Sequence, residues 1–348
     1  IWDKNEIKSH LSRDQFKVFS IYFGINKEEN FEKKYHLYVS YNKKENFKSK
    51  EKNTDYKILE ESLDILKVIR EKRKKPFVDE KVLTSWNALT IKSLVDFYKI
   101  SKDESYLFAC EKAINFLINN MVFKNGLHAT YKDGKSHINA YLDDYAFLID
   151  SILNFLSVKW NNNLFDKAIT LSNILIEKFL DKENGGFFFT ANDHENLIQK
   201  PKPTADEAFP SGNSIAARVL IKLGFLMNNT KYIDAASSTF MFASEQINNA
   251  PNAHSSFLDS YSLFKNPFIL VIIKSLDKSK DAEIWLDKLI DLNKSYVDYY
   301  LITENNTGYA NIDDKIVNNK TTAYICTNFS CEQPIYDIEE FISRINIL

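Results

Sequence analysis

Three polar motifs carry the residue types that acid–base chemistry on a small molecule requires. They span residues 79–87, 141–145 and 206–214. Each combines carboxylates with hydroxyl, amide or aromatic side chains. A pair of carboxyl groups near one sugar can protonate an oxygen and activate water. The motifs therefore indicate a site that binds a sugar-like ligand. They also supply the groups that its chemical conversion would need.

The adjacent acids Asp143 and Asp144 define the second motif. Neighbouring residues on a helix point about 100° apart, so both carboxyls cannot face one substrate atom. We expect one acid to cap a helix or to pair with Lys81 or Arg73, and the other to face the cavity; Asp143 lies at the expected N-cap and Asp144 one step inside. A hydrolase that uses two carboxylates would take its partner from Asp79 or Asp206.

The candidate site gathers these carboxyls with residues suited to stacking and hydrogen bonding. The predicted catalytic residues are Asp144, Asp79, Asp206 and His128. The predicted substrate-binding residues are Arg73, Lys81, Trp86, Asn87, Asp143, Tyr145, Ser211 and Asn213. Phe187 and Phe188 are further stacking candidates, and His137 is a second possible base beside His128.

A structural interpretation stands beside the functional one. Thr, Ser and Asp are the residues that cap helix N-termini, so Thr84, Asp143 and Ser211 can serve only to satisfy backbone donors. Capping does not explain the second acid, the amides Asn87 and Asn213, or an indole at a helix entrance. The combination of motifs is more specific than any one of them.

The sequence lacks the usual signals for metals and cofactors. It contains no H-E-x-x-H pattern, phosphate loop or dinucleotide fingerprint. Cys326 and Cys331 have no second ligand pair nearby, so we expect a structural thiol pair that binds no metal. Cys110 lies on an apolar helix and is expected in the core. No cofactor is predicted.

An internal repeat indicates how the motifs are positioned. An aromatic-x-x-Ala signature opens three amphipathic helices, at Tyr106, Phe165 and Tyr232. Twenty residues before each aromatic lies the start of a more apolar helix, near Trp86, Tyr145 and Gly212. Three inner–outer helical hairpins in register would bring the three motifs to one end of a barrel.

These patterns predict an all-α dominated fold, a closed (α/α)6 toroid of six hairpins. Further helices are expected at residues 5–11, 13–23, 58–73, 255–263, 282–292 and 336–345. The predicted domains are a helical barrel over residues 1–265 and an α+β segment over 266–348. Expected strands in that segment are 268–273, 297–302 and 322–326, with further strands at 126–131 and 185–190 over one barrel mouth.

Composition excludes several classes of protein. The 348 residues include only 8 Gly and 7 Pro, which argues against a turn-rich β-sandwich. The 45 basic and 47 acidic residues nearly cancel, so no nucleic-acid or membrane partner is expected. Three cysteines suit a reducing compartment, and we expect a cytoplasmic protein. The chain begins at Ile1 and not at a methionine, so we expect a segment to precede it. Whether that segment includes a signal peptide is left open by the sequence.

The ordered motifs resemble the YyaL-type family, also called the spermatogenesis-associated protein 20 family. The resemblance rests on residues 73–87, 142–149, 185–188 and 206–214, and on Cys326-x4-Cys331-x2-Pro334. It runs nearly end to end. Glu80 and Ala88 depart from the family pattern, where Asp-Asp-Lys and Trp-Asn-Gly are usual.

The resemblance implies a six-hairpin barrel similar to those of sugar epimerases and glycosidases. It also implies a covalently linked, N-terminal thioredoxin-like domain that this chain does not include. A specific reaction is not implied, because barrel similarity is a likeness of fold alone.

Two functions follow as hypotheses. The first is a carbohydrate-binding or carbohydrate-converting barrel, epimerase-, isomerase- or glycosidase-like, which takes a sugar-like small molecule. The second is a non-catalytic recognition or scaffold module that serves the thioredoxin-like domain, with Cys326 and Cys331 as its redox partners.

Overall fold

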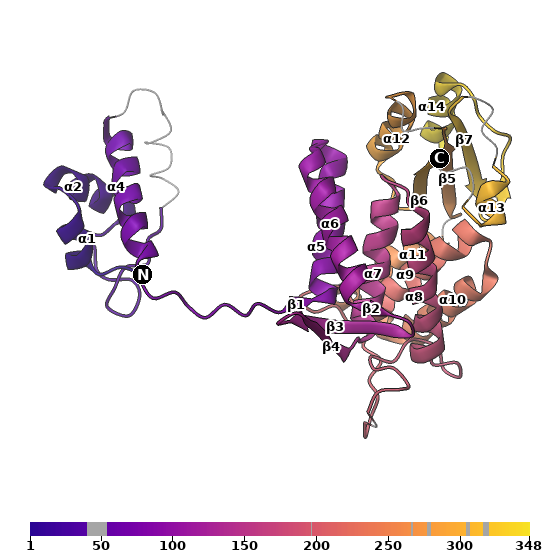
Figure 1. Ribbon diagram of the computed structural model, residues 1–348, viewed down its shortest axis with the longest axis horizontal. Helices are drawn as coiled ribbons and strands as arrows, with labels where there is room; N and C mark the ends of the chain where they lie inside the picture. The colour runs from indigo at the N-terminus through magenta and orange to yellow at the C-terminus, as the bar shows by residue number, and fades with distance from the viewer. Residues whose placement is uncertain (40–53, 196, 266, 277–279, 304–306, 316–319) are drawn as a thin grey trace. The chain divides into compact units, whose positions relative to one another are not determined.

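The computed structural model describes residues 1–39, 54–195, 197–265, 267–276, 280–303, 307–315 and 320–348. They form two compact units, residues 1–79 and 80–348 (Figure 1). The predicted domain boundary falls instead between residues 265 and 266, and residue 266 lies outside the described ranges. That division of the chain stays a prediction.

The N-terminal unit is a small helical cluster of α1 (Lys4–His10), α2 (Arg13–Phe23) and α4 (Thr54–Glu71). Helix α2 begins with a capping box between Ser12 and Gln15 and ends at Gly24. Gly24 has a φ of +71°, the left-handed conformation that glycine adopts without cost. The helices predicted for this unit are confirmed.

The second unit is built from helical hairpins. Three are complete among its described residues: α5 (Thr84–Ser101) with α6 (Glu104–Asn120), α7 (Leu142–Leu156) with α8 (Asn162–Phe179), and α9 (Gly212–Met227) with α10 (Thr230–Asn249). The 3₁₀ turn η1 (Pro251–Ala253) leads to α11 (Ser255–Lys265). Helices α5, α7, α9 and α11 contact one another in sequence as the inner layer, and the predicted register of the repeat is confirmed.

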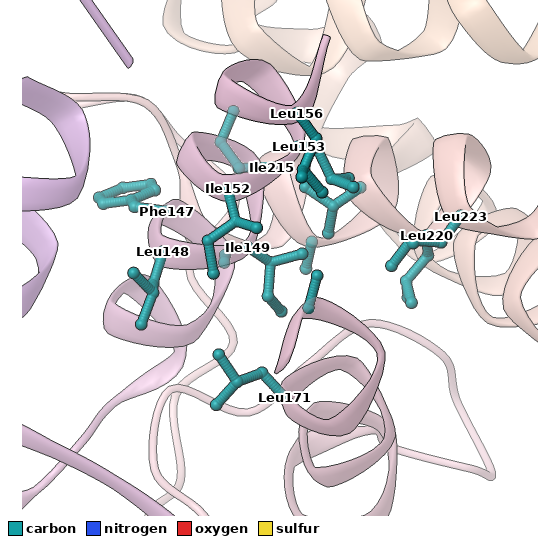
Figure 2. Packing of buried hydrophobic residues seen from close by; sticks show 14 of the residues in the cluster. Phe147, Leu148, Ile149, Ile152, Leu153, Leu156, Leu171, Ile215, Leu220 and Leu223 are labelled. Atoms are coloured by element: carbon teal, nitrogen blue, oxygen red, sulfur yellow. The ribbon is translucent and has the colours of Figure 1, made fainter. Parts of the chain in front are cut away.

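Burial explains why the inner helices are apolar on nearly every side. Helix α7 contacts α5 on one side and α9 on the other, with α8 behind it. Leu148, Ile149 and Ile152 are consequently fully buried, as Figure 2 shows. The outer helix α8 buries a narrower stripe that includes Phe165 and Leu171.

A four-stranded antiparallel sheet meets the starts of the inner helices. It consists of β1 (Val82–Leu83), β2 (Val122–Phe123), β3 (Gly126–Lys132) and β4 (Lys135–Asn139). The Thr84 hydroxyl, at the first residue of α5, donates to the His128 carbonyl of β3 at 2.7 Å. In the view of Figure 1 this sheet and the C-terminal strands lie at opposite ends of the helices.

The strand expected at residues 185–190 is wrong. Only an isolated bridge between Leu180 and Phe187 forms there. Gly185 and Gly186 both have a φ of +73°, which is incompatible with an extended strand. The side-chain amide of Asn213 forms hydrogen bonds with the backbone N–H and C=O of Phe187. A neighbouring strand would otherwise bind these two groups.

The C-terminal segment is α+β. Strands β5 (Ile269–Lys274), β6 (Val297–Ile302), β7 (Thr322–Thr327) and β8 (Ser330–Cys331) form a sheet in the order β6-β5-β7-β8. Only the β5–β6 pair is parallel. Helices α12 (Lys280–Leu292), α13 (Ala310–Asp313) and α14 (Ile338–Ile347) complete the segment. The strands and helices predicted here are confirmed.

The central strand β5 is buried on both faces. Val271 and Ile273 pack with Trp285 of α12 and Phe341 of α14 in a separate core. Leu270 and Ile272 join the core of the helical hairpins. The helix-dominated α/α hairpin fold with a small α+β segment confirms the predicted fold class.

The cysteines differ in state. Cys326 and Cys331 are joined by a disulfide across the β7–β8 pair, where free thiols are expected from the sequence. The buried Cys110 thiol donates to the Ile91 carbonyl at 3.5 Å, so its predicted place in the core is confirmed. In the described part of the chain, no helix has the length and apolarity to cross a bilayer.

Candidate functional site

The carboxyl of Asp144 joins the N-termini of two inner helices. Its Oδ1 accepts a hydrogen bond from the Ser85 backbone amide of α5 at 3.0 Å. Its Oδ2 accepts one from the Tyr141 amide, at the start of its own helix, at 3.0 Å. Only 4% of the residue is exposed. Both oxygens of Asp144 therefore accept hydrogen bonds from backbone amides. The side chain is buried and does not face an open cavity, contrary to the prediction from the sequence.

Burial raises the pKa of Asp144 to about 6. The hydrogen bonds from Tyr141 and Ser85 act in the opposite direction, because they stabilise the ionised form. Burial outweighs them. Asp144 is thus a structural carboxyl whose ionisation carries a free-energy cost at neutral pH.

Asp143 has a different role from the predicted one. The N-cap of α7 is Tyr141, so the expectation that Asp143 occupies that position is wrong. Its Oδ1 is a buried oxygen without a hydrogen-bond partner in the described structure. The atom lies against Gly212, where a Cβ would be only 2.1 Å from it. A glycine at the first turn of α9 is what leaves room for this carboxyl.

The surroundings of Asp143 favour its protonated form. Burial first, and then the negative charges of Asp144 and Glu207, raise its pKa to about 7. The Gly212 amide at the N-terminus of α9 opposes this shift. A carboxyl with a pKa near neutrality can both give and take a proton at physiological pH.

Asp206 joins the next two inner helices in the way that Asp144 joins the first two. Its Oδ1 accepts from the Ser211 amide at 2.9 Å, and its Oδ2 from the Ser256 amide at 2.8 Å. The Ser256 hydroxyl also donates to it. Burial alone would raise the pKa of Asp206, but the hydrogen bonds from Ser256 and Ser211 lower it overall. The ionised Asp206 is fixed at the starts of α9 and α11.

Asn213 is fully buried and hydrogen-bonded to backbone. Its Oδ1 accepts from the Phe187 amide at 2.6 Å. Its Nδ2 donates to the carbonyls of Phe187 and Pro203, both at 2.9 Å. The amide therefore anchors the loop before α9, and no group of it is left to bind a ligand directly.

We expect Asn213→Ala to lower the free energy of unfolding by about 2 kcal/mol. The substitution leaves the buried backbone N–H and C=O of Phe187 without their hydrogen-bond partner. Chemical denaturation of both proteins measures this difference. Asn163→Ala, exposed in the first turn of the outer helix α8, is the comparison, and we expect it to cost less than about 1 kcal/mol. Equal stability of Asn213→Ala and the parent protein would contradict the anchoring role.

The remaining predicted binding residues divide by exposure. Trp86 is 61% exposed at the first turn of α5, which leaves its indole open to a ligand. Asn87 donates to the Leu83 carbonyl at 2.8 Å. Tyr145 is buried against Phe179, at 5.2 Å between ring centroids. Ser211 donates to the Pro203 carbonyl at 3.2 Å.

The predicted stacking residues Phe187 and Phe188 also differ from each other. Phe187 is fully buried and cannot stack on a ligand. Phe188 is half-buried, with the Lys202 ammonium 5.3 Å from its ring centre. Trp86 is consequently the stronger candidate for contact with a sugar.

His128 lies on β3, half-buried, with its Nδ1 2.8 Å from the Ser136 hydroxyl. Its ring packs against Phe123 at 4.6 Å between centroids. Burial, with a contribution from His137, lowers its pKa and so favours the neutral imidazole. His137 itself is exposed on β4.

Two predicted site residues belong to the N-terminal unit. Arg73 donates to Glu6 at 2.8 Å and to the Ile1 carbonyl at 2.9 Å, and its guanidinium lies 3.9 Å from the Trp2 ring centre. Asp79 is the last residue of that unit. Lys81 is exposed just before β1. A role in the site for these three stays a prediction.

Sequence reasoning placed Glu207 and Gly212 in the third motif but assigned neither of them a role. Glu207 follows Asp206 directly, but nothing in its spacing indicates that its charge acts on Asp143. Gly212 could be found as the one glycine at the start of an inner helix. Among the described residues, no group of three or more His, Cys, Asp or Glu side chains could hold a metal ion.

The fold and the site define an α/α hairpin protein with carboxyls clustered at its inner-helix N-termini. No family model matches the chain. It is 26% identical over 302 residues to an uncharacterized protein of Caenorhabditis elegans, covering 83% of this chain and 41% of that protein. It is 23% identical over 300 residues to human spermatogenesis-associated protein 20, covering 80% and 38%.

These matches bear out the resemblance to the spermatogenesis-associated protein 20 family that the motifs predict. The chain spans about two fifths of the length of the curated relatives it matches.

Solved structures with similar coordinates include an alpha-mannanase from Bacteroides thetaiotaomicron, at a TM-score of 0.43 and 16% identity. That match covers 69% of this chain and 68% of the other. A cellobiose 2-epimerase from Spirochaeta thermophila matches at a TM-score of 0.39 and 13% identity, covering 47% and 43%.

Proposed function

We propose that the inner-helix N-termini form a carbohydrate-binding or carbohydrate-converting site, with Asp143 as its proton-transfer group. The observation that carries this proposal is the buried Oδ1 of Asp143, which has no hydrogen-bond partner in the described structure. Asp144 and Asp206 each hold two backbone amides with their two oxygens, whereas Oδ1 of Asp143 holds none. The function proposed for Asp144 from the sequence therefore passes to its neighbour.

The chemistry follows from the pKa of about 7. Both protonation states of Asp143 are populated at neutral pH, so it can donate a proton to a glycosidic oxygen or accept one from a sugar carbon. Glu207 supplies a second carboxylate, whose negative charge helps to raise the pKa of Asp143. A pair of carboxyls is what glycoside hydrolysis requires, and a single base of neutral pKa is what epimerisation requires.

Trp86 is the proposed stacking surface. It follows Ser85, whose amide Asp144 holds, so its place at the entrance of α5 is fixed. An exposed indole suits the apolar face of a pyranose ring.

Isothermal titration with a panel of neutral mono- and disaccharides tests the proposal, combined with chromatographic detection of altered sugars. We expect saturable binding of at least one sugar and its loss in Asp143→Ala. If no sugar on the panel binds or changes, the proposed function is wrong.

We expect Trp86→Ala to weaken sugar binding about tenfold, the effect of losing one aromatic contact. Its stability should change by less than about 0.5 kcal/mol, because the indole is mostly exposed. Phe108→Ala is the matched control, since this ring is 62% exposed on the outer helix α6. Undiminished sugar affinity of Trp86→Ala in the same titration would remove Trp86 from the site.

One observation favours the second candidate, a recognition module for a linked thioredoxin-like domain. The Cys326–Cys331 disulfide has one exposed end, at Cys331, on the short hairpin of β7 and β8. An accessible disulfide is a substrate for thiol exchange. Reduction by a thioredoxin, followed by thiol labelling, tests this function. Resistance to reduction in the folded protein would count against it.

A further inference from the structure

A second polar site lies at the other end of the inner helices. A solvent-open cavity of about 310 Å³ is lined by residues of α5, α7, α9 and α11 together with residues from 289–299 of the α+β segment. Asn154, which lines it, follows Asp143 by eleven residues on α7. At 1.5 Å of rise per residue, the two lie about 16 Å apart along the helix axis. The cavity is therefore separate from the proposed carbohydrate site.

Basic residues dominate the cavity lining. They are Lys92, Lys99, Arg218, Lys222 and Lys294. The lining also contains the three carboxylates Asp96, Asp259 and Asp298. The charge of Asp150, buried on α7, acts on Lys92 as well. Even with Asp150 included, five cations face four anions.

The acids of the lining are already engaged. Lys222 pairs with Asp298 at 2.9 Å, and that carboxylate also accepts from the Tyr300 hydroxyl at 2.8 Å. Arg218 pairs with Asp259.

Asp96 serves two lysines and an amide. It pairs with Lys92 at 3.0 Å and accepts from the Asn154 amide at 2.8 Å. Lys99 lies 3.7 Å from the same carboxylate. Its shorter contact is to the neutral Asn154 Oδ1, at 2.7 Å.

Lys99 is a largely buried cation of the lining that shares its nearest acid, Asp96, with Lys92. Burial lowers its pKa to about 8, and the like charges of Lys222 and Lys92 add to this shift, while the charges of Asp96 and Asp298 oppose it. A buried ammonium among like charges is costly unless an anion joins it. Three lysine ammonium groups from α5 and α9 thus converge on one polar cavity.

We propose that this cavity binds a small phosphate-bearing molecule, with the phosphate among Lys92, Lys99 and Lys222. Lysine presents a compact point charge with rotatable donors, which suits phosphate. Asn154, Ser157, Asn293 and Ser295 line the same cavity and supply hydrogen bonds for hydroxyl groups. The volume is at the lower end of small-molecule sites, so the ligand is of metabolite size.

A purely structural account makes the opposite prediction. Lysines near the C-terminal ends of helices stabilise the helix dipole without any ligand. In that case Lys99→Met would lower stability and would change no binding. The ligand account instead predicts loss of binding with the fold retained.

The test is calorimetric titration of the whole 348-residue chain with inorganic phosphate and with glucose 6-phosphate, alongside glucose and glucuronate. We expect at least one phosphate probe to bind, with Lys99→Met weakening its binding at least about tenfold, the loss of one charge-assisted hydrogen bond. Lys112→Met, on the outer face of α6, is the control and should bind as the parent does. Lys294→Met, at the half-buried rim, should weaken binding about two- to fivefold, and it serves as the second variant should Lys99→Met fail to fold.

Three results would overturn the proposal: no binding of either phosphate probe, equal phosphate binding by the parent and both cavity variants, or glucuronate bound in preference to the phosphates. None of them bears on the carbohydrate site, which is tested with neutral sugars and Asp143 variants. Loss of neutral-sugar binding with phosphate binding intact would mean that the proposed function fails and this inference stands.

Discussion

Asp144→Ala is expected to lower the free energy of unfolding by about 3 kcal/mol. The substitution removes the acceptor of two backbone donors, the amides of Ser85 and Tyr141, and a buried donor without a partner costs about 1–3 kcal/mol. It also removes the side-chain link between the starts of α5 and α7, two helices that contact each other. Urea denaturation at pH 7 measures the effect.

Asp234→Ala on the outer helix α10 is the matched control, because this acid is exposed. Its stability should stay within about 0.5 kcal/mol of the parent. Should Asp144→Ala match this control in stability but lose sugar binding, Asp144 would be a ligand-facing acid after all.

Asp143→Asn is expected to raise stability at pH 8 while abolishing sugar conversion. The pKa of Asp143 is raised from 3.8 to about 7, so the folded protein holds this proton more tightly than the unfolded chain. The stability linked to that proton is fully present below pH 3.8 and is lost as the pH rises through 7. Asparagine removes the cost of the buried charge, on the order of 2 kcal/mol at pH 8 for a partly exposed group.

Denaturation curves of the parent and Asp143→Asn at pH 4 and pH 8 provide the measurement. The gain should appear at pH 8 and nearly vanish at pH 4. Glu207→Gln offers a companion test, since removal of this like charge should lower the pKa of Asp143 and move the transition to lower pH. A loss of stability in Asp143→Asn at both pH values would make Asp143 a structural acid.

Much of the fold was predictable because its signals are local. The helix predicted at residues 13–23 and the strand predicted at 297–302 from its branched and aromatic residues have the bounds of α2 and β6 in the structure. The aromatic-x-x-Ala repeat sets the register of the hairpins. The segment at residues 185–190 failed because its partner is a side chain, Asn213, which lies 26 residues from Phe187.

The candidate site was only partly predictable. Residue types and helix positions predict that carboxyls gather at the inner-helix starts, but they do not assign which acid caps which helix. Asp144 caps α5, a helix 59 residues away in sequence, and Asp206 reaches Ser256, 50 residues away. These contacts depend on how neighbouring helices pack. The choice between Asp143 and Asp144 therefore needs the tertiary structure.

The most direct test of the account is a carboxyl-carbon NMR titration of Asp143 in the folded protein. Asp143→Asn identifies the resonance by its disappearance. We predict a midpoint near pH 7, set by burial and by the charges of Asp144 and Glu207. A midpoint near pH 4, the value of an exposed aspartate, would show that Asp143 is fully ionised at neutral pH and would contradict its role as the proton-transfer group.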